Sequence, residues 1–207
     1  MTARRMSAAL LALAVAATLF TRIGLNMDQN DVGLGAALWA IFRYFTIWTN
    51  TLIGFAAAGL ALGGRLDGRI SAGLLLAISA VGGVYHLLLA SLTDFQGVEA
   101  VIDTMLHTVV PIWFALQWVL FEPKARLRFA DIPLWLAYPA LYCLYALVRA
   151  SVDGVYPYPF LDIGKNGVAA ILVNMAGLLL AFAGLGALIV WVARLMTRIW
   201  PQGSTAT

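Results

Sequence analysis

Residues 70–92 read ISAGLLLAISAVGGVYHLLLASL and contain no aspartate, glutamate, lysine or arginine. About 20 consecutive apolar residues in a helix suffice to span the hydrocarbon core of a bilayer. This run therefore has the length and composition of a transmembrane helix. Its small residues, among them Gly82 and Gly83, favour close packing against neighbouring helices.

Five further apolar runs surround this one, and short connectors containing turn residues separate them. The six runs cover residues 6–23, 36–62, 70–92, 101–121, 132–148 and 168–196. The second and sixth runs are long enough to tilt or to project from the bilayer. We predict an all-α fold in which residues 1–207 form one domain, a bundle of six transmembrane helices.

The composition indicates an integral membrane protein, because 62% of the residues are hydrophobic and only 11% are charged. Soluble domains contain about 45–50% apolar and about 25% charged residues. The net charge of +3 does not indicate a nucleic-acid partner, since the basic residues gather at the ends of the apolar runs. Membrane lipids are the expected partners. The single cysteine, Cys143, lies within an apolar run, where we expect it to pack as a small hydrophobic residue.

The first apolar run follows Arg4 and Arg5 and resembles the start of a secretory signal peptide. It is followed by further apolar runs instead of a soluble region. We therefore expect this run to be retained as the first helix.

Positive charges divide the loops into two groups. Nine basic residues belong to one group of segment ends: Arg4, Arg5, Arg65, Arg69, Lys124, Arg126, Arg128, Arg194 and Arg198. The opposite ends hold Arg22, Arg149 and Lys165, while Arg43 lies within the second run. The acidic residues of those opposite ends are Asp28, Asp31, Asp94, Glu99, Asp153 and Asp162. By the positive-inside rule, both termini are predicted to be cytoplasmic, which agrees with an even number of helices.

Two polar side chains lie inside the apolar runs. Thr46 belongs to the stretch RYFTIWTN at residues 43–50, and His107 belongs to DTMLHTVVP at residues 103–111. Polar groups in hydrocarbon cost free energy unless they are paired or line a wet cavity, so both are functional candidates. A hydroxyl and an imidazole together form the simplest acyl-transfer machinery.

The expected depths of the two residues permit a contact. At about 1.5 Å per residue, Thr46 lies roughly 15 Å from the outer end of its run and His107 roughly 9 Å from the outer end of its own. Helical spacing also gives each residue polar neighbours. Arg43 and Asn50 share a helical face with Thr46, and Asp103 precedes His107 by one turn. Asn174 enters the last run at a similar depth.

Each of these residues also has a structural explanation. Thr46 could bond the Phe42 carbonyl one turn back, and Arg43 could extend to the headgroups. Asp103 could simply favour a helix N-terminus, and Asn174 could join two helices. A second membrane histidine, His86, has no acidic residue one turn away on its own helix. We therefore favour packing and hydrogen bonding over catalysis for His86.

Three stretches carry a resemblance to a known family. These are RYFT at residues 43–46, MLHTVVP at 105–111 and VYPYPFL at 155–161. Together and in this order they resemble the bacterial predicted six-transmembrane proteins, which are related to the androgen-induced and androgen-dependent membrane hydrolases of animals. The second stretch has one extra residue before the histidine, and the likeness extends over most of the chain.

The animal members hydrolyse fatty acid esters of hydroxy fatty acids. The resemblance implies that this chain is an intramembrane hydrolase of lipid esters like these, without implying the same substrate. It implies that Thr46 is the nucleophile and His107 the base. We expect Asp103 to orient His107, and Asn50 and Asn174 to be candidates for an oxyanion site.

Substrate contacts are expected from four residues. Arg43 could hold a substrate carboxylate, while Phe45, Trp48 and Trp113 would supply apolar bulk near the reactive pair. Neither a metal nor a cofactor is expected, because the two histidines and scattered acids form no recognisable ligand spacing. The expected location is a bacterial inner membrane.

Two other functions remain open from the sequence. A carrier or channel for lipids, protons or small solutes would use the intramembrane Arg, Asp and His residues as a pathway. A structural subunit would use them only to fix helix packing. Against a carrier, the chain has no inverted repeat and no pair of broken helices. The composition of the helices does not indicate an oligomeric state.

Overall fold

The computed structural model describes residues 1–124 and 127–199, which form helices and loops without a strand among them. Arg126, one of the basic residues used to orient the loops, lies outside these ranges, as does the C-terminal part of the predicted domain from residue 200 onward. The α-helices are α1 (Ala3–Asn30), α2 (Leu34–Ile41), α3 (Phe45–Ala61), α4 (Gly68–Val84), α5 (Val98–Thr104), α6 (Val110–Phe121), α7 (Ile132–Asp153) and α8 (Ile163–Ile199).

Two of the long helical spans contain a segment of π-helix. After α4, a π-helical segment (Tyr85–Leu89) and a 3₁₀ turn (Ala90–Leu92) continue the same span. A second π-helical segment (Met105–Val109) joins α5 to α6. Further 3₁₀ turns precede α7 (Phe129–Asp131) and α8 (Pro159–Leu161). Isolated π-helical turns are rare and are often found at functional sites.

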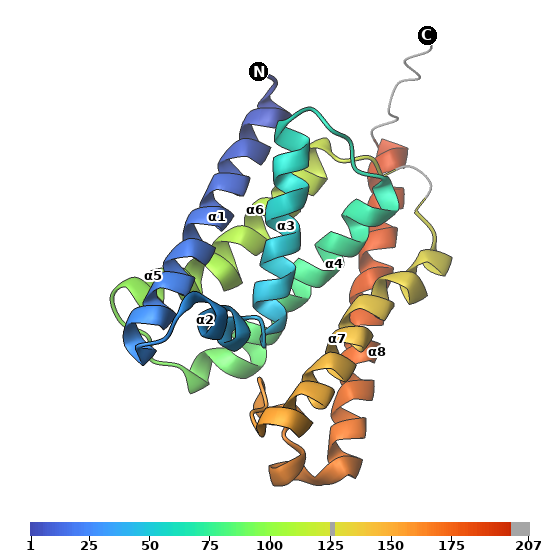
Figure 1. Ribbon diagram of the computed structural model, residues 1–207. Helices are drawn as coiled ribbons and strands as arrows, with labels where there is room; N and C mark the ends of the chain where they lie inside the picture. The colour runs from blue at the N-terminus through green and yellow to red at the C-terminus, as the bar shows by residue number, and fades with distance from the viewer. Residues whose placement is uncertain (125–126, 200–207) are drawn as a thin grey trace.

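The predicted membrane fold is confirmed at the level of long apolar helices. Within residues 1–124 and 127–199, five helical stretches are long and apolar enough to cross a membrane: Ala3–Asn30, Gly68–Leu92, Val98–Phe121, Phe129–Asp153 and Ile163–Ile199. Helix α3 is also apolar but has only 17 residues. Figure 1 shows these helices running alternately up and down.

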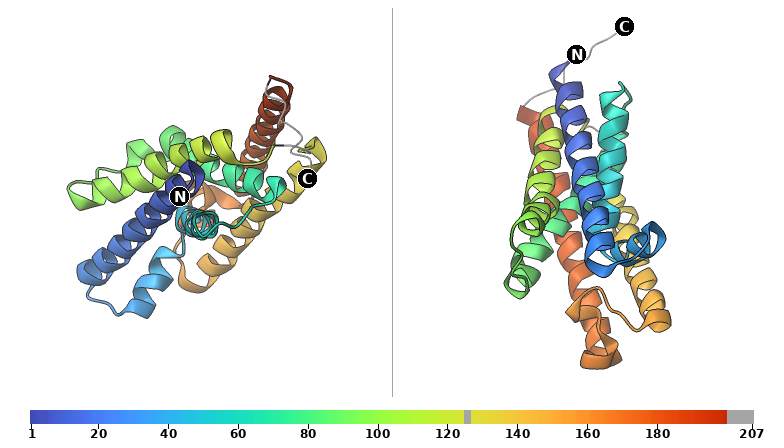
Figure 2. Two further views of the ribbon diagram at one scale, coloured as in Figure 1. Left: turned by 90° about the horizontal axis from the view of Figure 1, so that it is seen from above. Right: turned by 60° about the vertical axis from the view of Figure 1, so that its left-hand side comes forward.

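Helix α4 holds the bundle together. It packs against α3 and α6 on one side of the molecule and against α7 and α8 on the other. Figure 1 shows α7 and α8 side by side, to one side of the group that contains α1, α3 and α6, and Figure 2 shows the same helices from two further directions. The buried side chains Leu76 and Ile78 of α4 and Phe114 and Trp118 of α6 belong to one continuous apolar core. Helix α4 therefore contacts both groups of helices.

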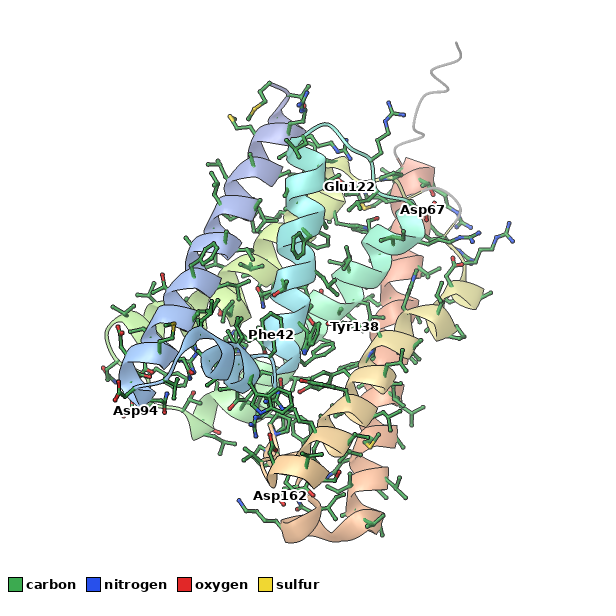
Figure 3. The ribbon with its side chains drawn as sticks, in the orientation of Figure 1. Phe42, Asp67, Asp94, Glu122, Tyr138 and Asp162 are labelled. Atoms are coloured by element: carbon green, nitrogen blue, oxygen red, sulfur yellow. The ribbon has the colours of Figure 1, made fainter. Side chains whose placement is uncertain are left out.

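Ion pairs join loops at one end of the bundle. At one end, Arg4 pairs with Glu122 (Nε to Oε1, 3.2 Å) and Arg69 with Asp131 (Nε to Oδ1, 3.4 Å). Figure 3 shows Asp67 and Glu122 at this end, and Asp94 and Asp162 towards the opposite end. Arg4, Arg69 and Arg128 from the larger basic group thus share an end, as the charge pattern predicted.

The prediction of the second helix is wrong in one respect, because residues 36–62 do not form one continuous helix. Helix α2 ends at Ile41 and α3 begins at Phe45, with a break between them. Arg43 consequently lies in the break and does not share a helical face with Thr46. The depth counted from residue 36 is also wrong, since Thr46 belongs to the first turn of α3.

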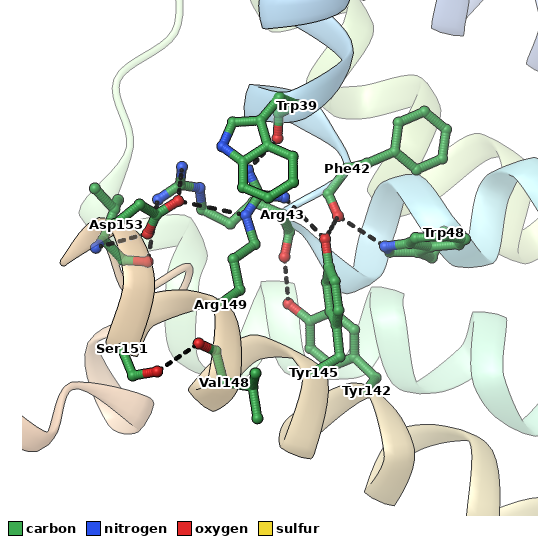
Figure 4. A network of polar contacts seen from close by, with 11 residues as sticks. Trp39, Phe42, Arg43, Trp48, Tyr142, Tyr145, Val148, Arg149, Ser151 and Asp153 are labelled. Atoms are coloured by element: carbon green, nitrogen blue, oxygen red, sulfur yellow. Dashed lines mark hydrogen bonds and ion pairs between the residues drawn. The ribbon is translucent and has the colours of Figure 1, made fainter.

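Hydrogen bonds from α7 satisfy the carbonyl groups that the break exposes (Figure 4). Tyr142 Oη donates to the Arg43 carbonyl at 2.7 Å, and Tyr145 Oη donates to the Phe42 carbonyl at 3.0 Å. Arg149 donates to the Trp39 carbonyl. A helix end inside a membrane bundle is stable only when such partners replace the missing helical bonds. The break therefore depends on contacts with α7.

Candidate active site

Thr46 points toward His107 from the first turn of α3. The distance from Thr46 Oγ1 to His107 Nε2 is 3.2 Å, so the expected contact between the two side chains is present. The Phe42 carbonyl accepts hydrogen bonds from Trp48 and Tyr145. The Thr46 hydroxyl is thus directed to the imidazole instead of to its own helix.

His107 is oriented by Asp103 across one turn. Its Nδ1 atom lies 3.0 Å from Asp103 Oδ1 and 3.1 Å from the Asp103 carbonyl oxygen. Both partners are acceptors, so a neutral imidazole carries its proton on Nδ1 and directs the Nε2 lone pair at Thr46. Asp103 is the sixth residue of α5, beyond the first turn where the helix dipole would explain it. The three side chains form a nucleophile, base and carboxylate in line.

Tyr85 completes this arrangement and was not identified from the sequence. Its ring stacks on the His107 ring, and its phenol donates to the second oxygen of Asp103. Tyr85 and His107 each lie in one of the two π-helical segments. The only signal in the sequence is a tyrosine within an apolar run, next to His86. Its partner could not be read from spacing, because the contact joins two different spans.

The reactive pair lies between two chambers. A wide chamber of about 310 Å³ and a narrow chamber of about 50 Å³ share five lining residues: Thr46, Tyr85, Leu89, His107 and Tyr158. Apolar side chains such as Leu178 and Phe182 line the rest of the narrow chamber. The wide chamber also contains Arg22 and Glu99, whose side chains pair at 3.6 Å.

The two asparagines expected at an oxyanion site are used elsewhere. Asn50 Nδ2 donates to the carbonyls of Thr46 (2.8 Å) and Leu106 (3.3 Å), and so ties α3 to the second π-helical segment. Asn174 Nδ2 donates to the Phe160 carbonyl at 3.0 Å. Neither side chain lines a chamber. The structure does not bring either amide to the reactive side of Thr46.

Arg43 binds the end of α7 and the loop that follows it. Its guanidinium contacts Asp153 (Nη2 to Oδ2, 3.0 Å) and the Val155 carbonyl (Nη1 to O, 3.0 Å). It is buried and lines neither chamber. The basic residue that lines the wide chamber is Arg22, which lies within α1. The sequence pointed to Arg22 only as a charge at a segment end.

The three expected aromatic contacts differ in position. Phe45 lines the narrow chamber. Trp48 Nε1 donates to the Phe42 carbonyl at 2.7 Å, and Trp113 Nε1 donates to Ser7 Oγ at 3.1 Å. Neither tryptophan lines a chamber. Only Phe45 is therefore placed to contact a bound chain.

His86 lies on the outer surface of its π-helical segment. Its Nε2 atom is 3.0 Å from Thr108 Oγ1, and the side chain is exposed and absent from both chambers. The hydrogen-bonded role favoured from the sequence agrees with this position. In the described ranges, no cluster of three or more His, Cys, Asp or Glu side chains forms a candidate metal site.

No protein-family model, curated protein or solved structure matches this chain.

Proposed function

We propose that this chain is an intramembrane hydrolase of lipid esters, with Thr46 as the nucleophile, His107 as the general base and Asp103 as the orienting carboxylate. The observation that carries the proposal is the line from Thr46 Oγ1 through the imidazole to Asp103, with contacts of 3.2 and 3.0 Å. A threonine is a weak nucleophile by itself and needs a base within hydrogen-bonding distance. The arrangement supplies that base together with the group that orients it.

The reaction follows from the positions of the protons. Thr46 Oγ attacks the ester carbonyl carbon while His107 Nε2 takes the hydroxyl proton, and the C=O electron pair moves to the carbonyl oxygen. When that pair returns, the bond to the alcohol oxygen breaks and His107 gives its proton to the departing alcohol. Water, deprotonated by His107, then attacks the acyl-threonine. The bond from the acyl carbon to Thr46 Oγ breaks, His107 returns its proton to that oxygen, and the acid is released. Asp103 compensates the positive charge that His107 carries between these steps.

The two chambers support a substrate with an internal ester. Because Thr46 and His107 line both chambers, a carbonyl held at the nucleophile would extend one apolar chain to each side. We propose esters of the kind formed by a fatty acid and a hydroxy fatty acid, in agreement with the sequence resemblance. The narrow chamber suits a short or thin segment, and the wide chamber suits the bulkier part.

We further propose six membrane spans, with α3 as the shortest, and with both termini cytoplasmic in a bacterial inner membrane. Support comes from the shared end of Arg4, Arg69 and Arg128 and from the alternating directions of the helices. The break before α3 shortens this helix without removing its apolar character.

A fluorophosphonate probe tests the catalytic assignment. It should label the purified wild type, and the label should be lost in Thr46→Ala. Thr51→Ala is the matched control, since Thr51 lies on the same helix but donates to the Ile47 carbonyl at 2.7 Å, away from both chambers. Hydrolysis of a branched long-chain ester should follow the same pattern.

The competing function, a carrier or channel, predicts a different result. A wild type that neither reacts with the probe nor hydrolyses any ester would contradict the hydrolase. Labelling that persists in Thr46→Ala would place the nucleophile at another residue.

A further inference from the structure

We propose that Tyr158 is a further catalytic residue, whose phenolic O–H donates a hydrogen bond to the carbonyl oxygen as that oxygen becomes negatively charged. This inference rests on the proposed hydrolase. The two amides that could have served this purpose, Asn50 and Asn174, donate to backbone carbonyls instead.

Tyr158 reaches the nucleophile from the loop between α7 and α8. The backbone N–H of Phe45 donates to Tyr158 Oη at 3.0 Å, and Phe45 directly precedes Thr46. The phenol therefore lies over the first turn of α3, beside the nucleophile. Tyr158 also lines both chambers together with Thr46 and His107.

The hydrogen bond from Phe45 leaves the phenol free to act as a donor. The N–H group occupies an acceptor position on the phenol oxygen, and donation to that oxygen strengthens the O–H as a donor. Two other phenols of the narrow chamber already donate their O–H groups: Tyr85 donates to Asp103, and Tyr142 donates to the Arg43 carbonyl. Burial raises the pKa of the Tyr158 phenol, so the group stays protonated at neutral pH.

The ring of Tyr158 is held in place before a substrate binds. It stacks on Phe160, with centroids 5.2 Å apart and planes 8° from parallel, and it meets Tyr44 edge to face at 6.1 Å. Prolines on both sides, Pro157 and Pro159, restrict the backbone. Donors that are already oriented need no rearrangement when negative charge develops, which is the main requirement of an oxyanion site.

The first test compares Tyr158→Phe with Tyr145→Phe. The first variant should lower kcat by about 10²–10³-fold with little change in KM, because an oxyanion donor acts mainly in the transition state. Tyr145→Phe also removes a phenol that supports the break, but Tyr145 lines neither chamber. Its kcat should stay within a few-fold of the wild type. A kcat for Tyr158→Phe within the same range would overturn the proposal.

A second test separates donation from capping of α3. Fluorinated tyrosines at position 158 make the phenol more acidic, which strengthens it as a donor and weakens it as an acceptor for the Phe45 N–H. At a pH where every analogue is still protonated, kcat should rise along the series if the phenol donates to the oxyanion. A flat or falling series would overturn this role.

The outcomes distinguish a failure of the hydrolase proposal from a failure of the role proposed for Tyr158. A wild type without ester hydrolysis would overturn the hydrolase and this inference together. An active wild type that loses activity in Thr46→Ala, combined with a flat fluorotyrosine series, would overturn only the role of Tyr158.

Discussion

Tyr85 lies face to face with His107, with ring centroids 3.9 Å apart and ring planes 11° from parallel. The same phenol donates to Asp103, so one side chain contacts both the base and its carboxylate. Tyr85 belongs to the span that continues α4, whereas the other two residues belong to the span of α5 and α6. The alignment of the base therefore depends on how these two spans pack.

Replacing Tyr85 by Phe keeps a ring to stack on His107 but removes the donor to Asp103. A hydrogen bond to a charged group contributes about 1.5–3 kcal/mol, so kcat should fall by roughly tenfold or more. Tyr85→Leu also removes the stacking and should lower kcat further. Steady-state rates of the purified variants measure both effects. Equal rates for Tyr85→Phe and the wild type would remove the phenol from the site.

Asp103→Asn should lower kcat by about 10³-fold or more, because an amide can favour the imidazole tautomer that carries its proton on the side of Thr46. Fluorophosphonate labelling should slow in parallel. Glu99→Gln is the matched control, since it makes the same change on α5 and lines the wide chamber without a contact to His107. A similar loss in both variants would indicate a general effect of charge instead of orientation.

Arg43→Leu should destabilise the protein without changing its substrate preference. The variant loses the contacts to Asp153 and to the Val155 carbonyl, which together contribute about 1–3 kcal/mol. Thermal unfolding in detergent measures the loss. The ratio of KM values for a free-acid substrate and its methyl ester should stay as in the wild type, because Arg43 lines neither chamber.

The effect of Arg22→Leu on substrate preference should be compared with that of Arg43→Leu. Arg22 lines the wide chamber, so a carboxylate bound there would lose a charge-assisted hydrogen bond in the variant. The KM of the free acid should then rise by about tenfold relative to that of the methyl ester. A shift in the Arg43 variant and none in the Arg22 variant would restore the original assignment of Arg43.

The proposed orientation can be tested with single cysteines in a Cys143→Ala background. Gln96→Cys and Lys165→Cys lie in exposed positions at the end opposite to the N-terminus, whereas Arg65→Cys lies at the basic end. A membrane-impermeant thiol reagent added to intact cells should label the first two and leave the third unlabelled until the cells are opened. The reverse pattern would invert the topology.

Composition and helical spacing account for much of the fold and for part of the site. The apolar runs predict the long helices, because their length and lack of charge leave no other stable form in a bilayer. The pairing of Asp103 with His107 follows from a separation of four residues, and the structure contains it. The length of an apolar run and the spacing of Asp103 and His107 are both local features, so the sequence alone predicts their consequences.

The break before α3 could not be predicted in the same way. Residues 42–44 contain neither proline nor glycine, and the surrounding run has the length of one long helix. Partners about 100 residues away, Tyr142 and Tyr145, make the break stable by binding its carbonyls. The positions of Tyr85 and Tyr158 depend on contacts between elements in the same way. Spacing along one helix carries no information about such contacts.

The π-helical turn at Met105–Val109 bears on how this protein could change by insertion and deletion. A π-helical turn holds one residue more than an α-helical turn, so it absorbs an inserted residue locally. Removing one residue there would rotate α6 by about 100° relative to α5. Either His107 would turn away from Thr46, or the buried face of α6, with Phe114 and Trp118, would turn away from the core. The additional residue of this π-helical turn thus keeps His107 beside Thr46 and the buried face of α6 in the core at the same time.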